Sequence, residues 1–286
     1  LAPYKFSAAP TVRINGTFDL MKGRSLNDAR FEVNGGPFQW VEFRCPRIHG
    51  QVHWLGDDVT LTNVVAEFYG GQIAGHAFFD ATTARGTRFS FLAMVAEVNL
   101  HTLMADISSR TNKLEGTLDG ELAIDSANTD DPKSWRGHGR VNLRDGLIWE
   151  FPIFGIFSPA LNAVSPGLGN SRARHGSATF TIKDGAVQSK DLQLQASGAR
   201  LDYSGSVDFD TKVRGKMEAE LFRNVPLVGK VMSLMLWPVT KIFEYKISGT
   251  LAQPKAEPVY VPGFLVHPFR SIKGIFPEEP KPPPEK

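Results

Sequence analysis

The chain has 286 residues, 42% of them hydrophobic, and a formal net charge of +2. This composition permits a packed interior and argues against wholesale disorder. Lys and Arg are scattered, which argues against a nucleic-acid-binding surface, because such a surface carries a basic stripe. The single cysteine, Cys45, cannot form an internal disulfide and is best interpreted as a small buried apolar residue.

The N-terminal part of the chain predicts a series of short strands. Residues 11–23 alternate, with Val12, Ile14 and Phe18 on one face and polar residues on the other, as in a half-buried strand. Further strands are expected near 28–34, 38–44, 47–55, 58–69, 72–80 and 87–98, with glycine-containing turns between them. The spacing of apolar residues then changes from alternation to a helical period, and residues 100–110 predict a short amphipathic helix.

The central part contains two Asp-Gly pairs that predict hairpins. Strand pattern returns over 112–125, and the polar stretch 126–134 predicts a loop. Asp145-Gly146 and Asp184-Gly185 each lie between alternating apolar residues, and a type I′ turn favours this dipeptide because both central residues need positive φ. Between the two pairs lies a first apolar insert with almost no charge. Its large side chains are Phe151, Ile153, Phe154, Ile156, Phe157 and Leu161.

The C-terminal part predicts more strands, a second insert and a tail. Residues 178–183, 192–196, 201–209 and 213–221 each alternate between apolar and polar side chains, which is typical of antiparallel sheets. Residues 223–243 form the second apolar insert, where Pro226 suits a helix start and Pro238 should kink or end the helix. Within 244–259 a strand is expected with Tyr245, Ile247, Gly249 and Leu251 on one face, and Pro254 should end it. Residues 263–286 form a Pro-rich tail that predicts disorder or polyproline conformation.

These elements predict a mainly β fold: a long, curved antiparallel meander sheet forming a groove or open barrel, with a few short apolar helices. The connections are short, so neighbours in sequence should be neighbours in the sheet. Three short helical candidates face a dozen or more strands, too few to cover every apolar strand face. A sheet with one apolar face must cover it by packing helices, by curling or by holding lipid.

Sequence motifs for catalysis and for metal binding are missing. The chain has no HExxH, GxSxG, P-loop or Rossmann fingerprint. The seven histidines are dispersed, and His49 and His53 would lie roughly 13 Å apart on one strand, too far for a shared metal. We therefore expect a protein that is not an enzyme and that needs neither cofactor nor metal.

Three stretches resemble the C-terminal module of the AsmA-like family of bacterial envelope proteins. They are GRVNLRDGLIWEFPIFGIFS (139–158), ATFTIKDGAVQSKDLQLQASGARLDYSGSVDFD (178–210) and VPLVGKVMSLMLWPVTKIFEYKISGTLAQPKAEPV (225–259). The likeness covers residues 114–259 best, within a single elongated module over 1–262. It implies a periplasmic protein tethered to the bacterial inner membrane. Since no window of about 18 uncharged apolar residues is present, the anchor would belong to an upstream segment absent from this sequence.

The resemblance implies an apolar β groove, of the bridge-like lipid transfer type, that holds or conducts phospholipid between membranes. The alternative is a scaffold for outer-membrane assembly whose sheet interior is closed by its own side chains, with envelope-assembly proteins as partners. The candidates for contact with lipid are Phe180, Ile182, Leu192, Leu194, Tyr203, Val207, Phe209 and Met217. In the two inserts, either membrane contact or plugging of the sheet ends is expected for Phe154, Ile156, Phe157, Val231, Met235 and Trp237.

Overall fold

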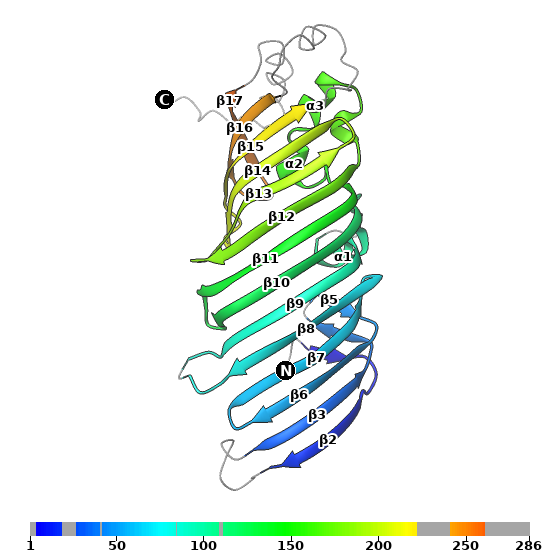
Figure 1. Ribbon diagram of the computed structural model, residues 1–286, viewed down its shortest axis with the longest axis vertical. Helices are drawn as coiled ribbons and strands as arrows, with labels where there is room; N and C mark the ends of the chain where they lie inside the picture. Colours follow the sequence, from blue (N-terminus) through cyan, green and yellow to red (C-terminus); the bar gives the residue numbers. More distant parts are fainter. Residues whose placement is uncertain are drawn as a thin grey trace, which may run out of the picture.

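The computed structural model describes residues 4–18, 27–40, 42–83, 85–108, 111–221 and 241–260. These residues form a curved antiparallel sheet of 14 strands that is not closed into a barrel, with strand order β17-β16-β15-β14-β13-β12-β11-β10-β9-β8-β7-β6-β3-β2 (Figure 1). The predicted curved meander is therefore confirmed. With neighbouring strands about 4.8 Å apart, the sheet extends over roughly 60 Å.

The strands of this large sheet are long. Their bounds are β2 (Thr11–Thr17), β3 (Asp28–Gly35), β6 (Ile48–Leu55), β7 (Asp58–Phe68), β8 (Gly71–Asp80), β9 (Arg88–Asn99), β10 (Glu115–Asn128), β11 (Asp131–Leu147), β12 (Ala173–Lys183), β13 (Ala186–Ala196), β14 (Ala199–Asp208), β15 (Val213–Leu221), β16 (Lys241–Gly249) and β17 (Pro254–Tyr260). A second, three-stranded sheet contains β1 (Tyr4–Phe6), β4 (Phe38–Trp40) and β5 (Phe43–Cys45).

The connections divide the large sheet into two different margins. Because every strand reverses direction, successive connections alternate between the two ends of the strands. Tight turns at 56–57, 129–130 and 184–185 lie on one side, which we call the hairpin margin. The connection 81–87 lies on the same side. Three long connections lie on the other side, which we call the insert margin, together with the tight turns at 69–70 and 197–198. They are 36–47 with the small sheet, 100–114 with α1 (Leu100–Ile107), and 148–172 with α2 (Pro152–Gly155), α3 (Ser158–Val164) and the 3₁₀ turn η2 (Leu168–Asn170) (Figure 1).

The two Asp-Gly pairs have different structures. Asp184-Gly185 forms the predicted tight turn, with φ values of 54° and 74°. Asp145-Gly146 was expected to form a second hairpin turn, and this prediction is wrong, because both residues lie inside β11. There one residue of β10 lies opposite the Asp-Gly pair, between the partners Glu115↔Leu147 and Thr117↔Arg144, and Asp145 has a φ of 52°. A β-bulge uses the same positive φ as the turn, so the dipeptide alone does not separate the two.

Three further boundaries differ from the sequence prediction. Residues 126–134 are not a loop, since β10 and β11 continue through them and only 129–130 form the turn. Pro254 does not end the strand expected within 244–259. That strand, β16, stops at Gly249, residues 250–253 reverse the chain, and Pro254 begins β17 at the edge of the sheet, where its missing N–H costs little. The single strand expected over 38–44 is two strands, β4 and β5, in the small sheet. The predicted helix over 100–110 is confirmed as α1, and the tail 263–286 lies outside the described residues.

The small sheet and α1 cover the insert margin in the N-terminal half. Cys45 of β5 and Leu103 of α1 pack with Phe68 and Val98 of the large sheet in a buried cluster. Burial raises the pKa of the Cys45 thiol. A polar contact closes this cover: Arg44 binds Asp106 through two hydrogen bonds, one of them 2.7 Å long, and the Tyr69 hydroxyl donates to Asp106 at 2.7 Å. The small sheet, α1 and the turn after β7 are thereby held together.

This polar contact predicts a pH dependence of stability. Burial and the hydrogen bond to Asp106 raise the pKa of Tyr69 from 10.0 to about 12. Between these values the unfolded chain loses the phenolic proton while the folded chain keeps it, so the free energy of unfolding falls as pH rises from 10 to 12. Tyr69→Phe should make this decline shallower, as measured by urea unfolding between pH 8 and 12. An equally steep decline in the variant would contradict the assignment.

The insert 148–172 covers the same margin in the C-terminal half. Phe157, Ala160, Leu161 and Val164 are buried against β13–β16 in the largest core cluster. The ring of Phe157 stacks on Phe243 of β16, with centroids 5.5 Å apart and an interplanar angle of 15°. The first apolar insert is thus a plug on the sheet, packed by its own aromatic and aliphatic side chains.

Candidate functional site: the apolar face

Cross-strand register aligns the apolar side chains of the large sheet in continuous rows. Residues that alternate along a strand share a face, and direct partners on neighbouring strands lie side by side on that face. One row crosses from β2 to β15 without a polar residue. It contains Ile14, Phe31, Val52, Leu61, Ala77, Phe91, Ile124, Gly137, Ile182, Val187, Val207 and Val213.

A second row runs beside it from β7 to β12. It contains Val64, Gly75, Ala93, Leu122, Gly139 and Phe180. All but Gly139, which is buried, are half-exposed, and Phe31, Val52, Leu61, Ala77 and Phe91 of the first row are half-exposed too. The apolar face is therefore accessible from β3 to β10. Beyond these strands, Phe180 of β12 is accessible too. No helix of the described residues covers these strands fully.

The opposite face is mostly polar and carries many of the ion pairs. Arg13 pairs with Glu32 across β2 and β3 at 2.8 Å, Arg140 pairs with Glu121 across β10 and β11 at 2.9 Å, and Lys216 pairs with Glu244 across β15 and β16 at 2.8 Å. The basic groups of these pairs are 46–83% exposed while Glu121 and Glu244 are partly covered, and surface ion pairs of this kind contribute little stability, about 0–1 kcal/mol. Their value is to keep this face solvated while the apolar face stays free of charge.

The eight candidates for lipid contact divide into three groups. Phe180 and Val207 lie half-buried in the two apolar rows, whereas Ile182 of the first row is buried against Ile124 and Ala127. Leu194, Tyr203 and Met217 are buried, with Met217 0% exposed, and Leu192 packs against the same cluster. For Leu194, Tyr203 and Met217 the expectation of an accessible apolar surface is wrong, because the plug 148–172 covers them. For Ile182 it is wrong because its neighbours in the sheet bury it, and Leu192 stays half-buried like Val207. Phe209 lies in the turn after β14 and is 42% exposed.

The structure favours the plug over membrane contact for the first insert. Phe157 is 1% exposed, and Phe154 and Ile156 pack half-buried against the same cluster. A side chain buried in this way cannot reach a bilayer while the plug is in place. Val231, Met235 and Trp237 of the second insert lie outside the described residues.

A row of aromatic rings along the hairpin margin was not recognised in the sequence. Phe79 contacts Phe89 at 6.1 Å between centroids, Phe89 contacts Trp135 at 5.4 Å, and Trp135 contacts Phe209 at 5.9 Å. The four residues come from β8, β9, β11 and the β14–β15 turn, so only the sheet register brings them together. The available signal was that each aromatic residue lies within a few residues of a hairpin turn.

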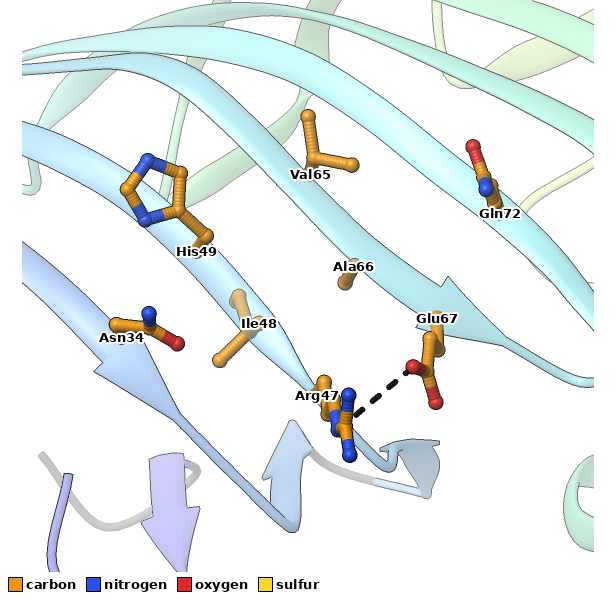
Figure 2. A pocket seen from close by; sticks show the side chains of 8 residues that line it. All are labelled: Asn34, Arg47, Ile48, His49, Val65, Ala66, Glu67 and Gln72. Atoms are coloured by element: carbon orange, nitrogen blue, oxygen red, sulfur yellow. Dashed lines mark ion pairs between the residues drawn. The ribbon is translucent and has the colours of Figure 1, made fainter.

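A depression of about 330 Å³ lies on the other, polar face (Figure 2). Its residues come from β3, β6, β7 and β8 and the segments beside them: Asn34, Arg47, Ile48, His49, Val65, Ala66, Glu67 and Gln72. The charges of Arg47 and Glu67 pair at 3.8 Å across one end. This depression offers a ligand no net charge, so we place the candidate site on the apolar face.

Neither a metal-binding cluster nor a membrane-spanning helix is found among the described residues. Over these residues, no group of three or more His, Cys, Asp or Glu side chains is arranged to hold a metal ion. None of the helices described has the length and hydropathy needed to cross a bilayer. No protein-family model, curated protein or solved structure matches the chain. The AsmA-like resemblance therefore rests on the motifs quoted from the sequence.

Proposed function

We propose that this protein is a non-enzymatic component of a bacterial cell envelope that holds or conducts phospholipid acyl chains along its apolar face. The observation that carries the proposal is the uninterrupted apolar row from β2 to β15, half-exposed from β3 to β9. Soluble monomers rarely expose apolar patches larger than a few hundred Å² unless the patch binds a partner, a membrane or a ligand.

The energetics favour acyl chains as the occupant. A strand of about 11 residues, such as β12, spans roughly 36 Å, which is longer than an extended acyl chain. Burying about 14 methylenes at ~0.8 kcal/mol each gives on the order of 11 kcal/mol, enough to remove a tail from water. Against a bilayer the same exchange is close to neutral, because both environments are apolar. A carrier needs such near-neutral exchange, since a tighter site would retain its cargo.

The proposed setting is the periplasm, with tethering to the inner membrane by an upstream segment. It follows from the AsmA-like resemblance of residues 139–158 and 178–210. The sheet's length of roughly 60 Å is about twice the hydrocarbon core of a bilayer, about 30 Å. A surface of this length suits transfer between two membranes better than storage of one lipid.

A second candidate function is a scaffold for envelope assembly with a closed protein core. It is favoured by the C-terminal third of the sheet, where Phe157, Phe243 and Met217 form a sealed interior. The two functions differ in the N-terminal and central strands, which a scaffold would cover with a protein partner and a carrier with lipid.

The proposal is tested by native mass spectrometry of protein purified without strong detergent. We expect one or more phospholipids to co-purify with folded protein and to exchange when vesicles of another composition are added. Folded protein that carries no lipid and takes none up from vesicles would reject lipid holding and leave the scaffold function.

A further inference from the structure

The two margins of the apolar face differ in what covers them. The insert margin carries the small sheet, α1 and the plug 148–172, whose side chains bury Val98, Leu143 and Leu201. At the hairpin margin the described residues supply turns and the connection 81–87 but no helix, and the apolar face ends at the aromatic row of Phe79, Phe89, Trp135 and Phe209. A ligand that lies on the two apolar rows can therefore reach solvent by passing these aromatic rings.

The rings of the aromatic row have apolar neighbours on one side and polar groups or solvent on the other. The Trp135 indole Nε1–H donates to the Asn128 carbonyl at 3.3 Å, while its ring packs between Phe89 and Phe209. Phe209 remains 42% exposed at the outer end. Amphipathic aromatic rings of this kind are enriched where acyl chains meet water, because one side is apolar and the other accepts hydration.

Charges of both signs lie directly outside the row. Arg88 and Asp80 lie one residue beyond Phe89 and Phe79, on the polar face at the strand ends, and pair at 3.1 Å, while Arg136, next to Trp135, pairs with Asp184 of the 184–185 turn at 2.9 Å. Arg88, Arg136 and Asp184 are 40–69% exposed, so these three groups can exchange their partners for other ions, whereas Asp80 is 18% exposed. Further charges along the same margin are Asp57, Asp58, Arg85, Asp130, Asp131, Lys133, Asp210 and Lys212. Such a rim matches a headgroup that carries one phosphate and one ammonium, and it lacks the cationic excess that an anionic headgroup would favour.

We propose that zwitterionic phospholipid enters the apolar face sideways through the hairpin margin, with its headgroup at the charged rim and its acyl chains beyond the aromatic row. The inference rests on the proposed lipid-holding function and adds the site of entry, the orientation and the headgroup class. Trp135 then marks the level of the glycerol backbone, and the plugged insert margin stays closed to lipid headgroups.

The experiment uses tryptophan fluorescence in two matched variants of the full chain. One keeps Trp135 and the other keeps Trp149, with the other four tryptophans replaced by phenylalanine. Trp149 is the control because it lies at the insert margin, where its Nε1–H donates to the Ser171 carbonyl at 2.8 Å. Each variant is loaded with phosphatidylcholine that carries a spin label either on the headgroup or at the end of an acyl chain.

We expect the headgroup label to quench Trp135 severalfold more than it quenches Trp149, and more than the acyl-end label quenches Trp135. Equal quenching of both tryptophans by the headgroup label, or stronger quenching of Trp135 by the acyl-end label, would overturn the orientation. No quenching by either label in folded, lipid-exposed protein would reject the lipid-holding function itself. If the multiple variants do not fold, replacing both tryptophans of the hairpin margin, Trp54 and Trp135, by phenylalanine should abolish most headgroup-label quenching of the natural sequence, and undiminished quenching would count against the inference.

The headgroup class is tested by competition in the same assay. Unlabelled phosphatidylethanolamine should restore Trp135 fluorescence at lower concentration than unlabelled phosphatidylglycerol. Equal or stronger competition by the anionic lipid would overturn the zwitterionic preference.

Discussion

Replacing Phe157 by alanine should lower the free energy of unfolding by about 3–5 kcal/mol, the usual cost of truncating a buried phenylalanine. Phe157 is 1% exposed and contacts two rings of β16, Phe243 at 5.5 Å and Tyr245 at 5.4 Å. Its removal leaves a cavity between the plug and the sheet that neither rigid element can fill. Urea unfolding followed by circular dichroism measures the change.

Phe154→Ala is the matched control for this prediction. Phe154 belongs to the same insert and has the same side chain, but it packs only half-buried at the edge of the cluster, against Phe151. The alanine substitution there should cost clearly less than at Phe157. If the two variants were equally stable, the insert would not be seated on the sheet through Phe157 as described.

Introducing a charge at Ala93 should remove lipid from the protein while leaving the fold intact. Ala93 lies half-exposed in the middle of the accessible apolar face, between its partners Gly75 and Leu122. In Ala93→Glu an acyl chain at this point would have to desolvate a carboxylate, which costs several kcal/mol. Since each 1.4 kcal/mol is tenfold in affinity, at least an approximately tenfold loss of bound phospholipid is expected.

The control is the adjacent residue of the same strand. Met94 is 44% exposed on the polar face, so Met94→Glu introduces the same charge one residue away and on the other side of the sheet. Lipid bound per folded protein is measured by mass spectrometry for both variants. Unchanged lipid content in Ala93→Glu, or an equal loss in Met94→Glu, would show that the apolar face is not where lipid lies.

Alternating hydrophobicity was sufficient to predict the sheet, because burial on one face imposes a period of two. Ala178, Phe180 and Ile182 were assigned to one face of a strand, and the register places all three on the apolar face. The same pattern could not show which apolar positions are covered. Val207 and Met217 look alike in sequence, but Met217 is buried under the plug while Val207 remains half-exposed. This difference arises from where the insert folds back, which a local pattern does not encode.

Local turn chemistry was informative only in part. Asp145-Gly146 and Asp184-Gly185 are the same dipeptide, but only the second reverses the chain. The deciding factor is the partner strand: Arg144 and Gly146 both pair with β12, so the backbone must continue past the bulge. The contact of Trp135 with Phe89 and Phe209 was likewise beyond the sequence, since these residues are far apart along the chain and meet only through pairing.

The alternation of successive connections between the two margins limits how such a molecule can be lengthened. Each added strand reverses the direction of the backbone, so a single extra strand would exchange the two sides for everything that follows it. Helices in later connections would then lie at the hairpin margin instead of the insert margin. Only additions in multiples of two preserve the arrangement, which makes the hairpin, rather than the strand, the unit by which natural variation or engineering can extend this architecture.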